Sequence, residues 1–245
     1  FDTAVRVTEA GSRPAALAAP AIRRITSSSR MATVGLDGSD MRRQETGMRD
    51  SRDADLLWDT ARRLNRAAGA SASTLPPMLF FTDPQRTPHP GVTARNLPTG
   101  AGIVYRHFGA EDAGAVAGEL KLISLERGLV FMIGADIDLA ERVGAHGVHL
   151  PERDLDQAGR LATAHPGWIL TGTVHDPDTM ADLSALTAVI LSPVFAAGGA
   201  SAGKSPWGVK TLAAFASRQD RPVYGLGGIG PDNVHDLIGS GSCGL

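Results

Sequence analysis

The feature that most constrains the fold is an alternation of short apolar runs with amphipathic segments, which begins at Met78 and continues to Leu245. Short apolar runs bounded by turn residues predict buried strands, and the segments between them have the spacing of helices. Strands and helices in regular alternation are typical of βα units built around a parallel sheet. The sequence therefore predicts an α/β fold for this part of the chain.

Seven strands are predicted, with helices between most of them. The predicted strands are Leu79–Phe81, Gly102–Arg106, Leu129–Ile133, Gly147–Leu150, Trp168–Thr173, Ala188–Leu191 and Pro222–Leu226. The predicted helices are Asp112–Arg127, Ile137–Val143, Leu155–Ala164, Asp178–Ala185, Val209–Ser217 and Pro231–Gly239. Thr87–Gly91, after the first strand, is too short and too rich in proline for a full helix. Ser242–Leu245 resembles the start of an eighth strand, so we expect a (β/α)8 TIM-type barrel that is truncated in its eighth βα unit.

The first part of the chain has a different character. Residues 1–50 hold scattered Arg, Ser, Ala and Gly without a sustained apolar period, which predicts a disordered or upstream tail. Residues 51–74 form a predicted helix and linker, because three apolar residues lie on one helical stripe: Leu57, Ala61 and Leu64. Residues 75–245 are then expected to form the main domain.

Charge and cysteine content narrow the class of partner. The chain carries 24 Lys plus Arg and 26 Asp plus Glu, a net charge of -2, so it has no broad electropositive field to attract nucleic acid or an anionic membrane. We find no long apolar run and no signal-peptide pattern. The single cysteine, Cys243, excludes an intrachain disulfide and a thiolate-rich zinc site. We therefore expect a soluble, cytoplasmic protein that binds a small molecule.

Phosphate binding is the clearest chemical signal. Val223–Gly230 reads Val-Tyr-Gly-Leu-Gly-Gly-Ile-Gly, a strand that leads into Gly227 and Gly228 and then into the helix predicted from Pro231. Two glycines let backbone N–H groups approach an anion closely, and a helix N-terminus adds a favourable partial charge. A tight turn that binds nothing is the alternative interpretation.

Six motifs follow one another in an order that resembles a known family. They are Leu79–Pro84, Gly102–Arg106, Ile137–Ala140 with Gly144–Leu150, Gly172–His175, Ser192–Phe195 and Gly227–Ile229. With these motifs, the chain from Met78 to Leu245 resembles the thiamine phosphate synthase/TenI family, whose members are (β/α)8 barrels. The resemblance implies a transferase of thiamine biosynthesis that joins aminopyrimidine methyl pyrophosphate to thiazole phosphate and releases pyrophosphate. The expected partners are these two small-molecule precursors.

The positions at which the family binds pyrophosphate and metal are only partly filled. The family's second strand ends in Gln-Leu-Arg-Glu-Lys, whose Arg and Lys bind pyrophosphate, whereas Val104–Phe108 keeps only Arg106. Ala135 stands at one metal-binding Asp of the family, with Asp136 beside it, and Asp154 occupies the place of the second. The resemblance thus implies Arg106 as a catalytic group and Asp154 as a ligand of an Mg²⁺ cofactor, which retains waters and leans on substrate phosphates.

The loop after the sixth strand is a further candidate. It runs from Ala196 to Gly208, where the family has an anion-binding loop. Lys204 is a candidate catalytic cation, and Ser201 is a candidate substrate ligand together with Thr173 at the end of the fifth strand. A flexible surface loop with an incidental lysine is the alternative.

His175 follows the fifth strand, where TenI-type thiazole tautomerases carry a His suited to proton transfer. An imidazole with an unperturbed pKa of about 6.5 both donates and accepts protons near neutrality. His175 is therefore a catalytic candidate, and a TenI-like thiazole tautomerase is an alternative function. A degenerate, non-catalytic barrel that binds thiamine precursors is another.

Three further polar residues near strand ends have no single assignment. His149 lies within a strand, and packing with hydrogen bonding in or near the barrel is its expected role. Asp83 follows the first strand and either faces the site or caps its own turn. His107 follows the second strand, and no role is predicted for it.

Overall fold

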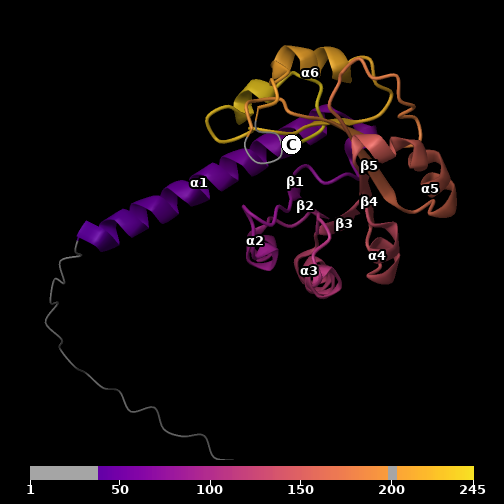
Figure 1. The fold of residues 1–245 in the computed structure, drawn as a ribbon. Coiled ribbons are helices and arrows are strands. Elements are labelled where there is room, and N and C mark those ends of the chain that lie inside the picture. The colour runs from indigo at the N-terminus through magenta and orange to yellow at the C-terminus, as the bar shows by residue number, and fades with distance from the viewer. Residues whose placement is uncertain (1–37, 198–202) are drawn as a thin grey trace, which may run out of the picture. The chain divides into compact units, whose positions relative to one another are not determined.

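The computed structural model describes residues 38–197 and 203–245. Its centre is one sheet of seven parallel strands, in which each strand pairs with the next one along the chain (Figure 1). The strands are β1 (Leu79–Phe81), β2 (Gly102–Tyr105), β3 (Val130–Gly134), β4 (Gly147–Leu150), β5 (Ile169–Val174), β6 (Ala188–Leu191) and β7 (Val223–Gly225). The predicted α/β fold with a parallel sheet is therefore confirmed, and no strand limit differs from the predicted one by more than one residue.

The last residues of the chain hydrogen-bond to both edge strands of this sheet. The N–H of Cys243 donates to the carbonyl oxygen of Val223 on β7 at 2.7 Å. On the other side, the N–H of Leu79 on β1 donates to the carbonyl oxygen of Leu245, also at 2.7 Å. The segment predicted to begin an eighth strand thus lies between β7 and β1.

Helices follow most of the strands and lie outside the sheet (Figure 1). They are α2 (Pro90–Asn96), α3 (Ala113–Arg127), α4 (Ile137–Arg142), α5 (Ala158–Ala164) and α6 (Gly208–Ala216), with the 3₁₀ turns η1 (Ala70–Ala72), η2 (Glu152–Gln157) and η4 (Val234–Leu237). Helix α2 follows the proline-rich segment because Pro90 is well suited to a first helical turn. Among the described residues, no helix combines the length and the apolar character that crossing a membrane requires.

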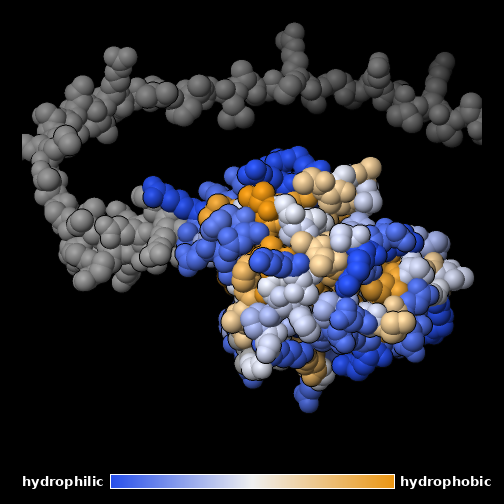
Figure 2. All heavy atoms as spheres, turned by 90° about the horizontal axis from the view of Figure 1, so that it is seen from above, coloured by the Kyte–Doolittle hydropathy of each residue, from blue (hydrophilic) through white to orange (hydrophobic). Residues whose placement is uncertain are grey.

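Apolar side chains pack on the two faces of the sheet as separate clusters. One cluster lies between the strands and the helices, and it joins Ile103, Phe131 and Val189 to residues of α3 and α6. The other gathers the residues that alternate with these along the strands, among them Val104, Met132, Ile190, Tyr224 and Cys243. Alternation along a strand sends successive side chains to opposite faces, so every strand except β4 contributes to both clusters, and β4 has Gly147 and His149 at the alternate positions. On the face drawn in Figure 2, apolar groups reach the surface only between hydrophilic ones.

Helix α1 spans Gly38–Ala67 and begins earlier than the sequence predicts. The predicted tail over residues 1–37 lies outside the described residues. Residues 38–50 are helical, because Met, Arg, Gln and Glu favour a helix even without an apolar stripe. Near the other end of the helix, Ala61 and Leu64 are buried, in agreement with the predicted stripe.

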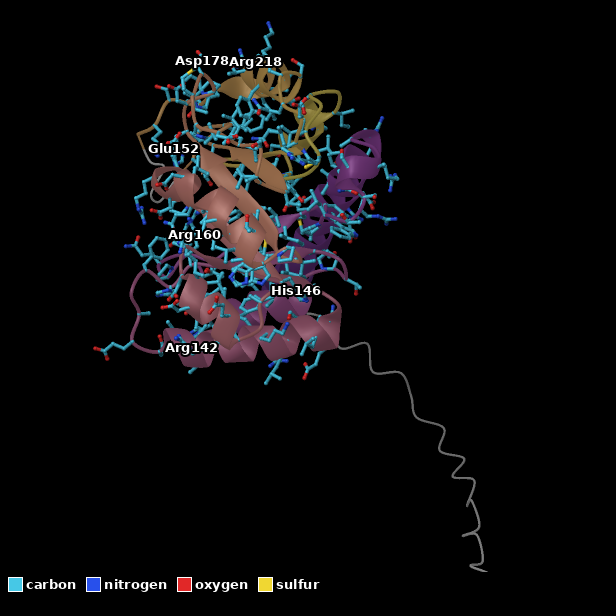
Figure 3. All side chains as sticks on the ribbon, turned by 90° about the vertical axis from the view of Figure 1, so that its right-hand side faces the viewer. Arg142, His146, Glu152, Arg160, Asp178 and Arg218 are labelled. Carbon is cyan, nitrogen blue, oxygen red and sulfur yellow. The ribbon has the colours of Figure 1, made fainter. Side chains whose placement is uncertain are left out.

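The helix predicted over Asp178–Ala185 is wrong, because turns occupy this segment. The Oδ1 atom of Asp176 accepts a hydrogen bond from the N–H of Asp178 at 3.0 Å, and the carbonyl oxygen of Asp176 accepts one from Thr179 at 3.1 Å. Local bonds of this kind compete with the bonds of a helix. Arg218 follows α6, and its Nη2 atom lies 3.5 Å from Oδ1 of Asp178. The two residues are adjacent in Figure 3, and this ion pair joins the segment to the end of α6.

The helix predicted over Pro231–Gly239 is also wrong, since only the short 3₁₀ turn η4 forms there. Asn233 accounts for the difference: its Oδ1 atom accepts from the N–H of Gly230 and its Nδ2 atom donates to the carbonyl oxygen of Gly228, both at 2.9 Å. These bonds fold the loop back on itself before η4 begins. A single 3₁₀ turn carries little of a helix dipole, so the helical part of the phosphate-binding argument fails and only the glycine pair supports it.

Candidate functional site

A cavity of about 640 Å³ opens where the strands end. Parallel strands finish at the same edge of a sheet, so the residues that follow them converge there. Its walls come from the ends of all seven strands and from the loops that follow them: Phe81, Arg106, His107, Phe108, Gly134, Ala135, Asp136, Ile137, Asp138, His149, Pro151, Arg153, Thr173, His175, Ser192, Lys204 and Leu226.

Several predicted site residues meet in this cavity. Its walls include Arg106, Thr173, His175 and Lys204. The other described candidates are not part of its lining: Gly227, Gly228 and Asp154. Ser201 falls in the segment 198–202, outside the described residues, so its predicted role stays a prediction.

Arg106 is held at the end of β2 by a hydrogen bond and by contacts with two aromatic rings. Its Nε atom donates to the carbonyl oxygen of Thr82 at 2.9 Å, and its guanidinium carbon lies 5.5 Å and 5.2 Å from the ring centres of Phe81 and Phe108. Burial lowers the pKa of Arg106, while nearby Asp83 raises it. A guanidinium remains charged despite such shifts. Arg106 is thus an oriented cation in the wall of the cavity.

Gly134, the last residue of β3, makes room for this arginine. A Cβ atom at Gly134 would lie 2.8 Å from Cγ of Arg106, which is too close for two carbon atoms. The absence of a side chain on β3 therefore lets the Arg106 side chain cross the strand end. This requirement could not be predicted from the sequence, because it depends on contact between neighbouring strands.

His175 has a fixed orientation at the end of β5. Its Nδ1 atom lies 2.8 Å from the carbonyl oxygen of Ser192, which can only accept, so Nδ1 carries the proton. Its backbone is held as well: its N–H donates to Oε1 of Glu152 at 3.0 Å, and its carbonyl oxygen accepts from Nε1 of Trp207 at 2.8 Å. In the neutral ring, Nε2 is then a proton acceptor. Within residues 38–197 and 203–245, Nε2 has no hydrogen-bond partner, as a proton-transfer group requires.

His149 lies buried between two threonine hydroxyls. Its Nδ1 and Nε2 atoms are each 2.9 Å from a hydroxyl, those of Thr171 and Thr173 respectively. Burial, with smaller contributions from Arg106 and His175, lowers the pKa of His149 to about 3. A neutral imidazole has one N–H, so one threonine accepts from the ring and the other donates to it. The expected role of His149 in packing and hydrogen bonding is confirmed, and Thr173 is partly committed to this bond.

Gly227 and Gly228 follow β7 in backbone conformations that suit glycine, with φ angles of 101° and 66°. A Cβ atom at Gly227 would lie 2.9 Å from Pro193, and one at Gly228 would overlap the backbone of Phe195 and Ala196. The glycine pair is therefore required by close approach to the loop after β6. Its predicted contact with phosphate stays a prediction.

Three carboxylates near the cavity, those of Asp83, Asp136 and Asp154, are already engaged within the protein. Asp83 caps its own turn, since its Oδ1 atom accepts from the N–H groups of Gln85 and Arg86 at 3.0 Å and 3.1 Å. Asp136 caps α4 through Oδ1, while Asp154 lies in η2 with Oδ2 3.6 Å from Nε of Arg153. Asp83 therefore caps its turn through Oδ1, while its Oδ2 atom lies 4.0 Å from Nη2 of Arg106 in the cavity wall.

The same geometry bears on the predicted Mg²⁺ ligand. No three His, Cys, Asp or Glu side chains are grouped for metal binding in the described part of the chain. Asp154 has a cation as its neighbour, and Asp136 has one oxygen committed to a helix cap. This donor set does not fit a cation held by the protein alone, and an Mg²⁺ ion would need the substrate phosphates as ligands. Mg²⁺ binding stays a prediction.

Three residues that bring a charge or an aromatic ring to the cavity wall were not predicted from the sequence. Arg153 adds a third cation to Arg106 and Lys204, whereas the family resemblance assigns a role only to the neighbouring Asp154. Phe81 and Phe108 add aromatic rings on both sides of Arg106. The available signal was their position, since each stands at or just after the end of a predicted strand.

This chain is similar to several known proteins. A family model described as thiamine monophosphate synthase matches residues 80–245. Among curated relatives, the thiamine-phosphate synthases of Methanoculleus marisnigri, Gloeobacter violaceus and Streptococcus agalactiae are 29%, 30% and 32% identical over 136, 129 and 136 residues. The matches cover 55%, 52% and 54% of this chain and 64%, 38% and 60% of those proteins. The chain thus spans less than two thirds of the length of these relatives.

Two solved structures with a similar fold can be compared with this chain. One is titled thiamine phosphate pyrophosphorylase from Pyrococcus furiosus, with a TM-score of 0.59 and 20% identity over 68% of this chain and 82% of that one. Another is titled native KDPGal structure, with a TM-score of 0.50 and 14% identity over 68% of this chain and 79% of that one. At these identities the likeness concerns the fold alone.

Proposed function

We propose that this chain, which belongs to the thiamine monophosphate synthase family, acts as a thiamine phosphate synthase. In this reaction the bond between the aminopyrimidine methylene carbon and pyrophosphate breaks, and that carbon forms a bond to the nitrogen of thiazole phosphate. The observation that carries the proposal is the convergence of Arg106, Arg153 and Lys204 on one cavity. These three cations outnumber the two carboxylates of the lining, Asp136 and Asp138, and two phosphorylated substrates with a departing pyrophosphate require a site of net positive charge.

The fold also supports the proposed synthase function. We infer that the seven strands and residues 243–245 belong to an eight-stranded barrel of the (β/α)8 type, because this segment bonds to both β7 and β1. In barrels of this type the reacting groups lie at the carboxyl ends of the strands. The cavity is lined by the corresponding residues of every described strand.

Arg106 is the residue proposed to stabilise the departing pyrophosphate. Its Nε atom donates to the carbonyl oxygen of Thr82, and the rings of Phe81 and Phe108 flank the guanidinium. Little reorganisation is therefore needed when charge develops on the leaving group. Lys204 is exposed on the loop before α6 and adds a mobile cation. Arg153, which is also exposed, completes the set from η2.

A second candidate function is thiazole tautomerisation, and the hydrogen bonds of His175 favour it. The proton on Nδ1 is fixed by the carbonyl oxygen of Ser192, so Nε2 is the atom that accepts a proton from the substrate and returns it. This reaction needs neither metal nor pyrophosphate. A tautomerase would give the three cations of the cavity no role, and for that reason we place the synthase first.

Arg106→Ala tests the proposal directly. With both substrates and Mg²⁺ saturating, we expect the wild-type chain to release pyrophosphate and Arg106→Ala to turn over about ten- to a hundredfold more slowly, because a charge-assisted contact of about 1.5–3 kcal/mol is lost. Arg106→Lys, which keeps the charge, is expected to lose less. Arg95→Ala is a matched control, since Arg95 pairs with Glu119 and Glu126 on the surface, away from the cavity.

The same assays separate the two enzyme functions. In a synthase, His175→Asn slows pyrophosphate release less than Arg106→Ala does. In a tautomerase the order reverses, since removal of a positioned acid/base costs about 10²–10⁴-fold in thiazole isomerisation. A wild-type chain that is silent in both assays, yet binds either precursor by calorimetry, would refute both and favour a non-catalytic barrel.

A further inference from the structure

Backbone strain is concentrated at one side of the cavity mouth. Among the described residues, two that are not glycine have φ angles in the left-handed region, Phe108 at 50° and Ala135 at 65°. Both line the cavity, in the loops that follow β2 and β3. Such conformations are costly for residues with a side chain and persist where surrounding contacts impose them. Their coincidence in two neighbouring loops indicates that this part of the cavity has a defined task.

One hydrogen bond joins the two strained loops. His107, next to Phe108, places Nε2 3.0 Å from Oδ2 of Asp136, the residue after Ala135. The N–H of Gly109 donates to Nδ1 of His107 at 3.0 Å, so Nδ1 is an acceptor and Nε2 carries the proton given to Asp136. Both ring nitrogens are thereby used, and His107 is left as a clamp between loops without a free site for proton transfer.

The clamp holds a large aromatic ring in an exposed position. Phe108 is 64% exposed, although burial would be favourable for a side chain of this size. Its ring lies 5.2 Å from the guanidinium carbon of Arg106, so the aromatic surface and the cation are adjacent in the same wall. At this position the family resemblance places a lysine, and the chain presents an aromatic face there.

We propose that Phe108 is a specificity-determining residue, whose ring stacks on the flat heteroaromatic ring of the pyrophosphate-bearing substrate. This inference rests on the proposed synthase function and names the group that selects the aminopyrimidine. Because Arg106 lies over one face of the Phe108 ring, the planar substrate ring stacks on the opposite, exposed face and extends its methylene pyrophosphate past the ring edge toward Arg106. Stacking is favourable for an electron-poor ring, and the ring of the aminopyrimidine becomes electron-poor as pyrophosphate departs.

The test compares two probes by calorimetry, aminopyrimidine methyl pyrophosphate and inorganic pyrophosphate. We expect Phe108→Ala to weaken binding of the aminopyrimidine compound about tenfold, a typical loss for one stacked ring, and to leave inorganic pyrophosphate within about twofold of the wild type. Phe108→Trp keeps an aromatic ring and is expected to bind the aminopyrimidine compound as the wild type does. Leu125→Ala, at an apolar side chain of α3 that is 63% exposed, is the matched control and is expected to change neither.

Thermal unfolding gives an independent readout. Phe108→Gly removes both the ring and the steric cost of the left-handed φ, so we expect a melting temperature equal to or above that of the wild type together with the same loss of aminopyrimidine binding. A residue with a purely structural role would lose stability on this change. Asp136→Asn, which weakens the clamp, is expected to reduce aminopyrimidine binding by less than Phe108→Ala does.

The possible failures are distinguishable. Unchanged aminopyrimidine binding in Phe108→Ala, or equal weakening of both probes, overturns the stacking role while pyrophosphate release by the wild type still supports the synthase. A wild-type chain that binds inorganic pyrophosphate but gains nothing from the attached pyrimidine overturns the stacking role at once. A wild-type chain that binds neither probe and releases no pyrophosphate overturns both the synthase and this inference.

Discussion

Replacing Gly228 with Asp is expected to abolish binding of a phosphorylated thiazole, with affinity reduced by more than about a hundredfold. The residue has a φ of 66°, and a Cβ atom there would overlap the backbone of Phe195 and Ala196. The loop after β6 must therefore move away. The new carboxylate also brings negative charge to the loop that is predicted to supply N–H groups to the phosphate. Two or three charge-assisted hydrogen bonds of about 1.5–3 kcal/mol each account for the expected loss.

A matched variant separates position from charge. Gly230→Asp adds the same charge to the same loop, but a Cβ atom at Gly230 meets no neighbour and its N–H is already bonded to Asn233. We expect it to weaken binding much less, and Gly228→Ala to show the steric part alone. Calorimetry with thiazole phosphate and a thermal melt of each variant are the measurements. Wild-type affinity in Gly228→Asp would remove the phosphate-loop assignment, and equal losses in both Asp variants would attribute the effect to charge at a distance.

The strands could be predicted from sequence because their pattern is local. Runs such as Val130–Gly134 and Ala188–Leu191 are apolar on both faces, as strands covered by helices on one side and by other strands' side chains on the other must be. The failures occurred where short polar side chains decide between helix and turn. Asp176 and Asn233 bond to nearby backbone, and apolar periodicity does not record such competition.

The candidate site, like the fold, could be predicted from the sequence only in part. Arg106, Thr173, His175 and Lys204 could be brought together from sequence because strand ends meet at one edge of a parallel sheet. The tautomer of His175 could not be predicted, since it depends on the carbonyl oxygen of Ser192, the residue that follows the next strand. The aromatic wall was missed for a different reason. The resemblance defines Phe108 only by the lysine that it replaces, and its contact with Arg106 depends on how the folded loop places the ring.

Acid is expected to destabilise the protein through His149, and the direction follows from its pKa. In the unfolded chain an imidazole titrates near 6.5, whereas burial lowers the pKa of His149 to about 3 in the folded state. Above pH 6.5 both states are neutral and the full stability is present. Between pH 6.5 and about 3 only the unfolded state binds the proton, so stability falls by about 1.4 kcal/mol per pH unit. The expected loss between pH 6.5 and 5 is therefore about 2 kcal/mol from this residue.

Urea unfolding at pH 7, 6 and 5 measures this contribution in the wild type and in His149→Asn. The variant is expected to be less stable at pH 7, because Asn fills the space between Thr171 and Thr173 poorly, but to lose about 2 kcal/mol less than the wild type on acidification to pH 5. His235→Asn, at an exposed ring of η4, controls for removal of a histidine as such. Parallel pH profiles for wild type and His149→Asn would mean that His149 is protonated in the folded protein. The cavity would then carry a further positive charge beside Arg106, and the hydrogen bonds to both threonines would have to be reassigned with the ring as donor to each.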